Sequence, residues 1–300
     1  MSAVIVDQLY KSYGKTRALN GVSFSVDEGE LYGIIGPDGA GKSTLFRVLT
    51  TLMLADKGDA RVMGYDVVKD YRKIRDIIGY MPGKFSLYQD LTVEENLRFF
   101  ATVFNTTIEE NYHLIADIYK QIEPFKHRKA GKLSGGMKQK LALSCALIHK
   151  PKVLFLDEPT TGVDPVSRKE FWGMLLKLKR QGITILVSTP YMDEASLCDR
   201  IALVQAGEFL QVDTPRSVVS RYPATLLAVR SGKMHQLLGD LRDYPHVNTS
   251  FSFGTAFHVT LREGGSLDDL KAYLMQKGHS DVAIQAILPS VEDCFMLLSK

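Results

Sequence analysis

Glycine residues surround a single lysine between residues 36 and 44, where the sequence reads GPDGAGKST. Gly36, Gly39 and Gly41 carry no side chain, so the backbone there can wrap round an anion with its N–H groups pointing inward. The apolar run before this loop predicts a strand, and the one after it predicts a helix whose N-terminus favours negative charge. This order of strand, loop and helix is typical of a phosphate-binding loop.

Lys42, Ser43 and Thr44 close this loop and open the predicted helix. We expect the Lys42 ammonium group to reach the β- and γ-phosphates of a nucleotide, with Thr44 completing the nucleotide-binding segment. We expect Ser43 to bind Mg²⁺ through its hydroxyl, because this cation keeps most of its waters and takes few protein oxygens. An incidental glycine turn is the competing interpretation, and the strand and helix on either side argue against it. The predicted cofactors are ATP and Mg²⁺.

Two carboxylates end a second apolar run, at residues 153–158. A buried strand would deliver Asp157 to the carboxyl edge of a sheet, where it could bind Mg²⁺ directly or through water. Glu158, the next residue, could polarise an attacking water as a general base. Such an acidic pair, taken alone, is more often a helix cap or a surface feature. Beside a phosphate loop it indicates catalysis, so Glu158 and Lys42 are the predicted catalytic residues.

The segment LSGGMKQK at residues 133–140 begins another helical run. Ser134 is a natural N-cap, and Gly135 and Gly136 expose their amides, so the segment could bind an anion with uncharged donors. It resembles the signature sequence of the ABC ATPase family, and the resemblance extends over about residues 4–215. In that family the signature binds the γ-phosphate held by the opposite subunit, which implies a dimer that sandwiches ATP.

The resemblance gives further residues a role. Tyr13 matches the aromatic residue that stacks on adenine, although without the family a core tyrosine would be the default interpretation. Asp164, in the segment GVDP, matches the loop that runs along the dimer interface. Residues 85–88 match the contact with the membrane partner's cytoplasmic coupling helix. Details of several motifs look like exporters of the ABC-2 type, which move drugs, lipids or polysaccharides.

Two positions depart from the family pattern. The family has glutamine where this chain has Gly83, and histidine where this chain has Pro190. Those two side chains contact the attacking water and the γ-phosphate, and neither replacement can supply the lost hydrogen bonds. Losing one preorganised donor slows a reaction by about 100- to 1000-fold. We therefore expect a weakened site in this subunit and a heterodimer with a partner ATPase, rather than a homodimer.

Two other interpretations stay open. The chain could be a regulatory or dimerisation module that uses ATP to hold an interface with little turnover. It could also be a soluble ABC protein of ribosomes or DNA repair. Proteins of that kind usually carry two cassettes or a long coiled-coil insertion, and the sequence has neither.

The elements that must position these residues follow from the apolar pattern. Continuous Val-, Ile- and Leu-rich runs predict strands buried on both faces in a largely parallel sheet. The fold class is therefore α/β, an ABC ATPase cassette at residues 1–220 with an inserted helical subdomain at about 91–150. A small α+β appendage follows at 221–300. The predicted strands of the cassette are 31–35, 77–81, 153–157, 183–188 and 201–204. The appendage is predicted to contain strands at 224–229, 247–253, 256–261 and 282–286, and helices at 233–241, 266–275 and 291–299.

Composition limits the remaining possibilities. No stretch approaches the ~18 apolar residues of a membrane-spanning helix, so a membrane-spanning permease partner must supply any membrane contact. Cys145, Cys198 and Cys294 lie outside any metal-ligand spacing, which favours buried thiols in a reducing compartment. The net charge of +3 and a basic cluster at residues 126–132 without stacking aromatics argue against nucleic acid. We expect a cytoplasmic protein, peripheral on the inner face of the cell membrane.

Overall fold

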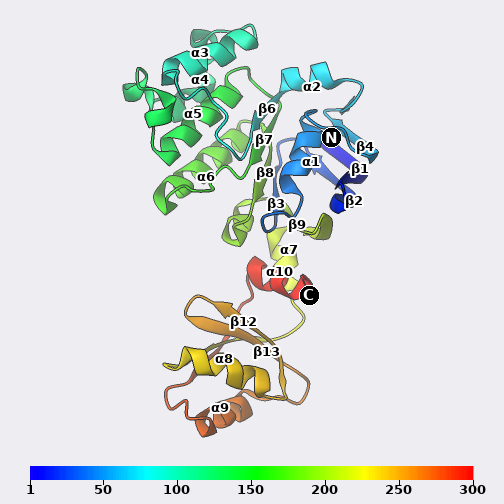
Figure 1. Cartoon of the computed structure of the whole chain (residues 1–300), viewed down its shortest axis with the longest axis vertical. Helices are drawn as coiled ribbons and strands as arrows, with labels where there is room; N and C mark the ends of the chain where they lie inside the picture. The colour runs from blue at the N-terminus through cyan, green and yellow to red at the C-terminus, as the bar shows by residue number, and fades with distance from the viewer. Residues whose placement is uncertain (300) are drawn as a thin grey trace. The chain divides into compact units, whose positions relative to one another are not determined.

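The computed structural model describes residues 1–299 of the chain (Figure 1). Its contacts form two compact units, the first being Met1–Pro215 and the second starting at Arg216. No helix within the described residues is long and apolar enough to cross a membrane. The three cysteines are free and buried, as the sequence predicts, and burial raises the pKa of the Cys145 thiol.

The division between the units lies earlier than the boundary expected at residue 220. Helix α7 (Pro215–Ser220) begins at the division rather than ending the first unit. Its buried Val218 carbonyl lies 3.6 Å from the Cys294 thiol, which donates to it. Cys294 belongs to α10 (Val291–Leu298), close to the end of the described chain, so this contact joins α7 to the second unit. A contact between residues so far apart in sequence is not visible in local composition.

A six-stranded mixed sheet forms the centre of the first unit, in the order β10-β9-β3-β8-β7-β6. Its strands are parallel except β10, which pairs antiparallel with β9. Every residue of β3, β7 and β8 is buried, which explains their continuous apolar sequences. The strands span Leu31–Ile35 (β3), Ile78–Met81 (β6), Val153–Asp157 (β7), Thr184–Thr189 (β8), Arg200–Gln205 (β9) and Glu208–Asp213 (β10). The predicted α/β fold is confirmed.

A second, antiparallel sheet has the order β2-β1-β4-β5. Helix α1 (Lys42–Leu49) buries Phe46 against the central sheet, where its ring meets Phe155 edge to face at 5.7 Å between centroids. Apolar residues of α1, β1, β2 and β4 share one core with residues of the central sheet. The strands span Ser2–Tyr13 (β1), Thr16–Asp27 (β2), Lys57–Val62 (β4) and Tyr65–Asp66 (β5). The helix that follows the phosphate loop is thus fixed between two sheets.

Helices replace strands in the inserted segment, which Figure 1 shows at one side of the central sheet. Thr92 and Glu95 form the expected capping box, with Thr92 Oγ1 accepting from the Glu95 N–H at 3.2 Å. Leu97 and Ala101 are buried in the subdomain core, whereas Phe100 and Phe104 of the same apolar stripe line a cavity. The helices span Val93–Val103 (α3), Ile108–Tyr119 (α4) and Gly135–Leu147 (α5), with α2 (Tyr71–Ile77) before them and α6 (Pro165–Arg180) after them.

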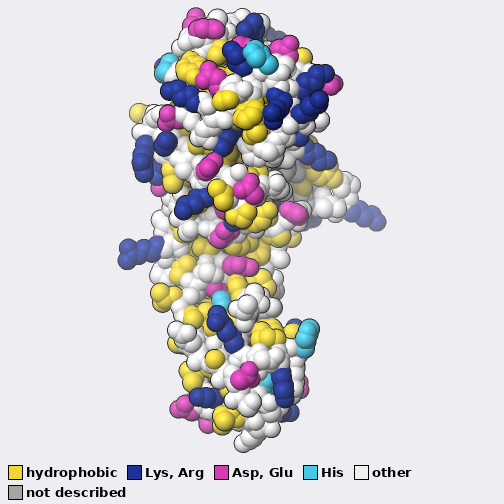
Figure 2. Space-filling model, turned by 90° about the vertical axis from the view of Figure 1, so that its left-hand side faces the viewer, with side chains coloured by type: hydrophobic (Ala, Val, Ile, Leu, Met, Phe, Trp, Pro, Cys, Tyr) yellow, Lys and Arg dark blue, Asp and Glu magenta, His cyan; other side chains and the backbone are white. Residues whose placement is uncertain are grey.

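The basic cluster at residues 126–132 lies beside this subdomain. Arg128, Lys129 and Lys132 are exposed, and the Arg128 guanidinium lies 4.6 Å from the centroid of the Phe125 ring. Lys126 lies 4.0 Å from a Glu94 carboxylate oxygen. On the face of the molecule drawn in Figure 2, basic and acidic side chains are interspersed among apolar ones. The cluster is a solvated surface with acidic residues close by.

The second unit is an antiparallel sheet with helices, in the chain order βαββαβ. Its strand order, β12-β13-β11-β14, is that of a ferredoxin-like fold. Apolar residues of β11, β13, α8 and α9 form its core. Buried His279 links two segments of this unit through hydrogen bonds of 2.8 Å to Ser231 Oγ and 2.9 Å to Asp240 Oδ2. The elements span Leu226–Arg230 (β11), Met234–Asp243 (α8), Val247–Phe253 (β12), Ala256–Leu261 (β13), Leu267–Gln276 (α9) and Ala283–Ile287 (β14).

Candidate nucleotide site

The loop between β3 and α1 needs glycine at particular positions. Gly39 and Gly41 have φ angles of 80° and 102°, in the region that side chains disfavour. A Cβ atom at Gly41 would lie 2.1 Å from the Ala18 carbonyl oxygen, and one at Gly36 would lie 2.1 Å from that of Val204. The loop is therefore packed against β2 and β9 and leaves its backbone amides as its main donors.

Lys42 is buried beneath this loop. Its Nζ atom donates to the carbonyl oxygens of Gly36 at 2.8 Å and Pro37 at 2.9 Å. The same atom lies 3.1 Å from Glu158 Oε1 and so forms an ion pair with the carboxylate that the sequence predicts to be catalytic. The Lys42 side chain is 2% exposed, and a buried ammonium needs an anionic partner. Glu158 supplies this negative charge. An anion bound by the loop would be attracted to the same ammonium group.

The carboxyl ends of β7 and β8 meet at Asp157 and Ser188. Ser188 Oγ donates to Asp157 Oδ1 at 2.6 Å and accepts from the Glu158 N–H at 3.1 Å. Glu158 has a φ of 50°, a left-handed conformation that costs a non-glycine residue about 1 kcal/mol or more. Ser188 therefore orients the Asp157 carboxylate and holds the backbone of Glu158. The sequence prediction did not assign it to the site, although a polar residue ending the strand beside β7 is a usable signal.

All of the predicted nucleotide-binding residues except Gly36 line one cleft of about 270 Å³. Tyr13 stands at its edge, 45% exposed, and its hydroxyl donates to the Met53 sulfur at 2.9 Å. An exposed aromatic ring beside a phosphate loop is available for stacking. The residues of the cleft that the sequence predicted are Tyr13, Gly39, Gly41, Lys42, Ser43, Thr44 and Glu158. The structure thus brings together residues that lie far apart along the chain.

Ser43 and Asp157 line an adjoining cleft of about 590 Å³, together with Glu158 and Gly83. A hydroxyl and a carboxylate oxygen are ligands that Mg²⁺ prefers. Within residues 1–299, no cluster of three His, Cys, Asp or Glu side chains could hold a metal ion by itself. The available donors therefore fit a cation that keeps most of its waters and takes further oxygens from a bound phosphate.

Gly83 and Pro190 border this part of the site. A Cβ atom at Gly83 would lie 3.2 Å from the Asp157 carbonyl oxygen and 3.7 Å from its Oδ2 atom, so a side chain there would lie against Asp157. Pro190 follows β8 directly after Thr189, whose carbonyl accepts from the Gly36 N–H at 3.2 Å. Neither residue has a side-chain hydrogen-bond donor. The site therefore has no side-chain donor at either position.

The signature segment does not line the cleft of its own chain. Ser134 caps α5, its Oγ accepting from the Met137 N–H at 3.4 Å. A Cβ atom at Gly136 would lie 2.8 Å from Ser167 Oγ on α6, and one at Gly135 would lie 3.3 Å from the Gly162 carbonyl oxygen. The glycines thus also allow α5 to pack closely against α6 and the loop before it.

Asp164 caps α6 at the end of that loop. Its carboxylate accepts from the N–H groups of Val166 at 3.1 Å and Ser167 at 3.0 Å. The Ser167 backbone hydrogen bond is the main cause of the lowered Asp164 pKa. This arrangement holds the loop at residues 162–165 in a defined position beside the signature segment.

Comparison with known proteins gives the family of these features. The sequence pattern described as "ABC transporter" matches residues 19–161. The probable multidrug ABC transporter ATP-binding protein YbhF of Escherichia coli is 38% identical over 276 residues, which are 91% of this chain and 47% of YbhF. The chain therefore spans about half the length of that relative.

Other proteins match along most of their length. The Nod factor export ATP-binding protein I of a Rhizobium species is 33% identical over 305 residues, covering 100% of this chain and 98% of that protein. Among solved structures, the dimeric cassette MJ0796 with ADP and Pi, in a post-hydrolysis state, aligns with a TM-score of 0.64 and 27% identity. The alignment covers 70% of this chain and 98% of the MJ0796 chain.

Proposed function

The chain belongs to the ABC transporter family of ATP-binding proteins, and from this premise we propose that it powers an exporter as one half of an asymmetric ATPase dimer. The observation that carries the proposal is the convergence of Lys42, Asp157 and Glu158 at the carboxyl ends of β3 and β7. Members of this family are ATPases, and the proposal is supported by Glu158, which lines both of the adjoining clefts that contain Lys42 and Asp157.

The phosphate loop binds the nucleotide. The amides around Gly39 and Gly41 point at the phosphates, whereas the Gly36 N–H donates to the Thr189 carbonyl, and Lys42 neutralises the β- and γ-phosphates. Thr44 lies in the first turn of α1, and Tyr13 stacks on the adenine ring. Lys42 Nζ lies 3.1 Å from Glu158 Oε1, so bound phosphates would compete with this carboxylate for the ammonium group. Nucleotide binding then releases Glu158 towards the attacking water, which it deprotonates or polarises.

Ser43 and Asp157 would hold Mg²⁺ beside the phosphates. The cation supplies charge that stabilises the transferring phosphoryl group. Asp157 keeps its orientation through the 2.6 Å hydrogen bond from Ser188 Oγ. Ser188 therefore acts as a positioning residue for the Asp157 carboxylate and for the backbone of Glu158.

The asymmetry rests on Gly83 and Pro190. Each composite site takes its phosphate loop from one subunit and its signature from the other. Ser134, Gly135 and Gly136 are available to a partner ATPase, together with the interface residue Asp164. The local site lacks donors at Gly83 and Pro190, so this subunit holds ATP at a slow site and completes a competent one on its partner.

The exporter assignment is supported by the names of two relatives, a multidrug transporter and a Nod factor exporter. The chain docks through residues 85–88 on membrane-spanning permease subunits, and so lies peripherally on the inner face of the membrane. The permease subunits contain the cargo pathway. ATP closes the dimer, hydrolysis reopens it, and the permease converts this motion into export.

Glu158→Gln separates this proposal from a purely regulatory use of ATP. The purified chain is titrated with a fluorescent ATP analogue, and its phosphate release is followed with Mg²⁺ present. We expect saturable binding and a slow phosphate release that Glu158→Gln removes without weakening binding. Unchanged phosphate release in the variant would favour a module that binds ATP without catalysing its hydrolysis at this site.

A further inference from the structure

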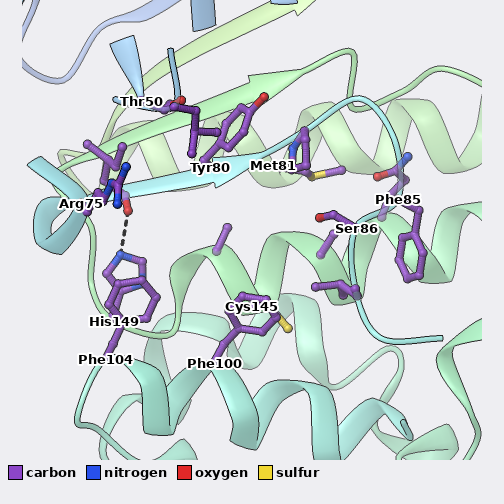
Figure 3. Close-up of a pocket in the computed structure, with 17 residues that line it drawn as sticks. Thr50, Arg75, Tyr80, Met81, Phe85, Ser86, Phe100, Phe104, Cys145 and His149 are labelled. Carbon is purple, nitrogen blue, oxygen red and sulfur yellow. Dashed lines mark hydrogen bonds between the residues drawn. The ribbon is translucent and has the colours of Figure 1, made fainter. Parts of the chain in front are cut away.

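The second unit leaves one edge of its sheet open. Strand β14 is the last strand in the order β12-β13-β11-β14, and it pairs with β11 on one side only. Gln285 and Ala286 are exposed, so solvent reaches this edge. The N–H and C=O groups of alternate residues of β14 point away from the sheet, where another strand can bind them. The edge thus offers backbone groups, in contrast to the mostly apolar side chains that line the cavity of the first unit (Figure 3).

Strand β14 lacks the features that usually keep an edge strand from pairing. Those features are charged side chains, proline and β-bulges. The strand reads AIQAI and contains neither a charge nor a proline, and all of its residues pair in register with β11. The opposite edge strand, β12, has a register shift between Val247 and Thr249, and such an irregularity bends an edge. Of the two edges, β14 is therefore the better suited to pairing.

The sequence of β14 is complementary to itself when two copies run antiparallel about Gln285. Ala283 then lies opposite the partner's Ile287. Ile284 lies opposite the partner's Ala286, so that each large side chain meets a small one. Gln285 meets the partner's Gln285, and two amide side chains can donate to and accept from each other. Because the strand carries no charge, this pairing brings no like charges together.

The residues on either side of β14 extend the match. Leu288 is 90% exposed, and the pairing places it opposite the partner's Val282, which adds apolar surface to the contact. Pro289 has no N–H group and ends the ladder after Leu288. Asp281, the charged residue nearest before the strand, lies opposite the partner's Pro289 rather than a second charge. The segment at 282–288 therefore fits a second copy of itself.

We propose that β14 pairs antiparallel with β14 of a second copy of this chain, about a two-fold axis at Gln285. The two four-stranded sheets become one continuous sheet. A two-fold contact uses the same surface on both copies, so the assembly closes at two. The contact lies in the second unit and leaves Ser134 and Asp164 of each copy to a partner ATPase. The pairing goes beyond the proposed function and does not depend on it.

Sedimentation of the purified full chain without nucleotide tests the pairing, because a dimer that sandwiches ATP cannot form in this condition. The concentration is raised to about 0.2 mM, since one pair of strands makes a small and weak interface. Hydrogen exchange of the β14 amides is measured at the lowest and highest concentrations. We expect a monomer–dimer equilibrium, with slower exchange of the outward-pointing amides of β14 in the dimer.

Charge variants locate the contact. Gln285→Lys should raise the dissociation constant by about tenfold or more, because two ammonium groups then meet at the axis. Asn248→Lys, which places the same charge on an exposed residue of the opposite edge strand β12, is the control and should leave the dimer unchanged. An equal mixture of Gln285→Lys and Gln285→Glu should form the dimer again, since opposite charges then face each other.

A chain that stays monomeric over the whole concentration range would overturn the proposal. So would a dimer that Gln285→Lys does not weaken, or one that Asn248→Lys weakens to the same extent. ATP binding is measured on the same variants and should match that of the unmodified chain, because neither change touches the nucleotide cleft. Failure of the pairing is therefore distinct from failure of the ATPase assignment.

Discussion

The two halves of the nucleotide site differ in completeness. The half that binds phosphate has its glycine loop and the buried Lys42, whose ammonium group already meets a carboxylate at 3.1 Å. The half that is proposed to contact the attacking water and the γ-phosphate has Glu158, but Gly83 and Pro190 carry no side-chain hydrogen-bond donor. Binding and turnover thus depend on different residues of one cleft. On the proposed function, this difference would let the site retain ATP while its hydrolysis is slow.

Glu158→Gln should have the largest effect on turnover, which depends on the second half of the site. Removing a general base slows a reaction by about 100-fold or more, so residual ATP turnover should disappear. ATP affinity should rise, because the phosphates no longer compete with a carboxylate for Lys42. Turnover and equilibrium binding are measured on the same preparation. Weaker ATP binding in the variant would contradict the competition between Glu158 and phosphate.

Lys42→Ala should disable the half of the site that binds phosphate. The loop loses its buried cation and Glu158 loses its partner, so ATP affinity should fall by about 100-fold. Titration with a fluorescent ATP analogue measures the change. Lys169→Ala, which alters an exposed lysine on α6, is the control and should leave the affinity unchanged.

Ser188→Ala should sharpen the comparison, because the Ser188 hydroxyl bonds the Asp157 carboxylate and the Glu158 N–H rather than the phosphate loop. Loss of the hydrogen bond to Asp157 should raise the Mg²⁺ concentration needed for half-maximal turnover by about tenfold. Nucleotide affinity without Mg²⁺ should change little. A Mg²⁺ dependence equal to that of the unmodified chain would show that Asp157 does not need this orientation.

Gly136→Ala should have the smallest effect on the cleft and act on folding instead. The new methyl group would meet Ser167 Oγ at 2.8 Å, so overpacking should lower the free energy of unfolding by about 1–3 kcal/mol. Adding Ser167→Gly should restore most of the loss by making room. Thermal unfolding of the single and double variants measures both effects, and an additive loss would refute the packing explanation.

The sequence predicted most of the central sheet and of the appendage. Strands β3 and β7 were predictable because burial on both faces leaves a continuous apolar run. Strands β1 and β2 were missed, because their apolar residues alternate with exposed ones and register shifts interrupt their pairing. Gln8 in β1 even has a φ of 46°, which no strand pattern indicates.

The candidate site was predictable where its functional residues are consecutive in sequence, as in the phosphate loop. It was not predictable where partners come from distant segments. The pairing of Lys42 with Glu158, and the hydrogen bonds of Ser188 to Asp157 and to the Glu158 backbone, depend on strand order. The apolar stripe of α3 likewise predicted a helix but not that Phe100 and Phe104 would line a cavity.

The central claim is that Gly83 and Pro190 slow hydrolysis without preventing ATP binding. The most direct measurement is ATP turnover of the purified chain, before and after the paired changes Gly83→Gln and Pro190→His, with ATP affinity measured alongside. The account predicts tight binding with slow turnover, and a rise of about 100-fold or more when both donors are restored. Brisk turnover in the unmodified chain would contradict it, because other residues would then supply those contacts.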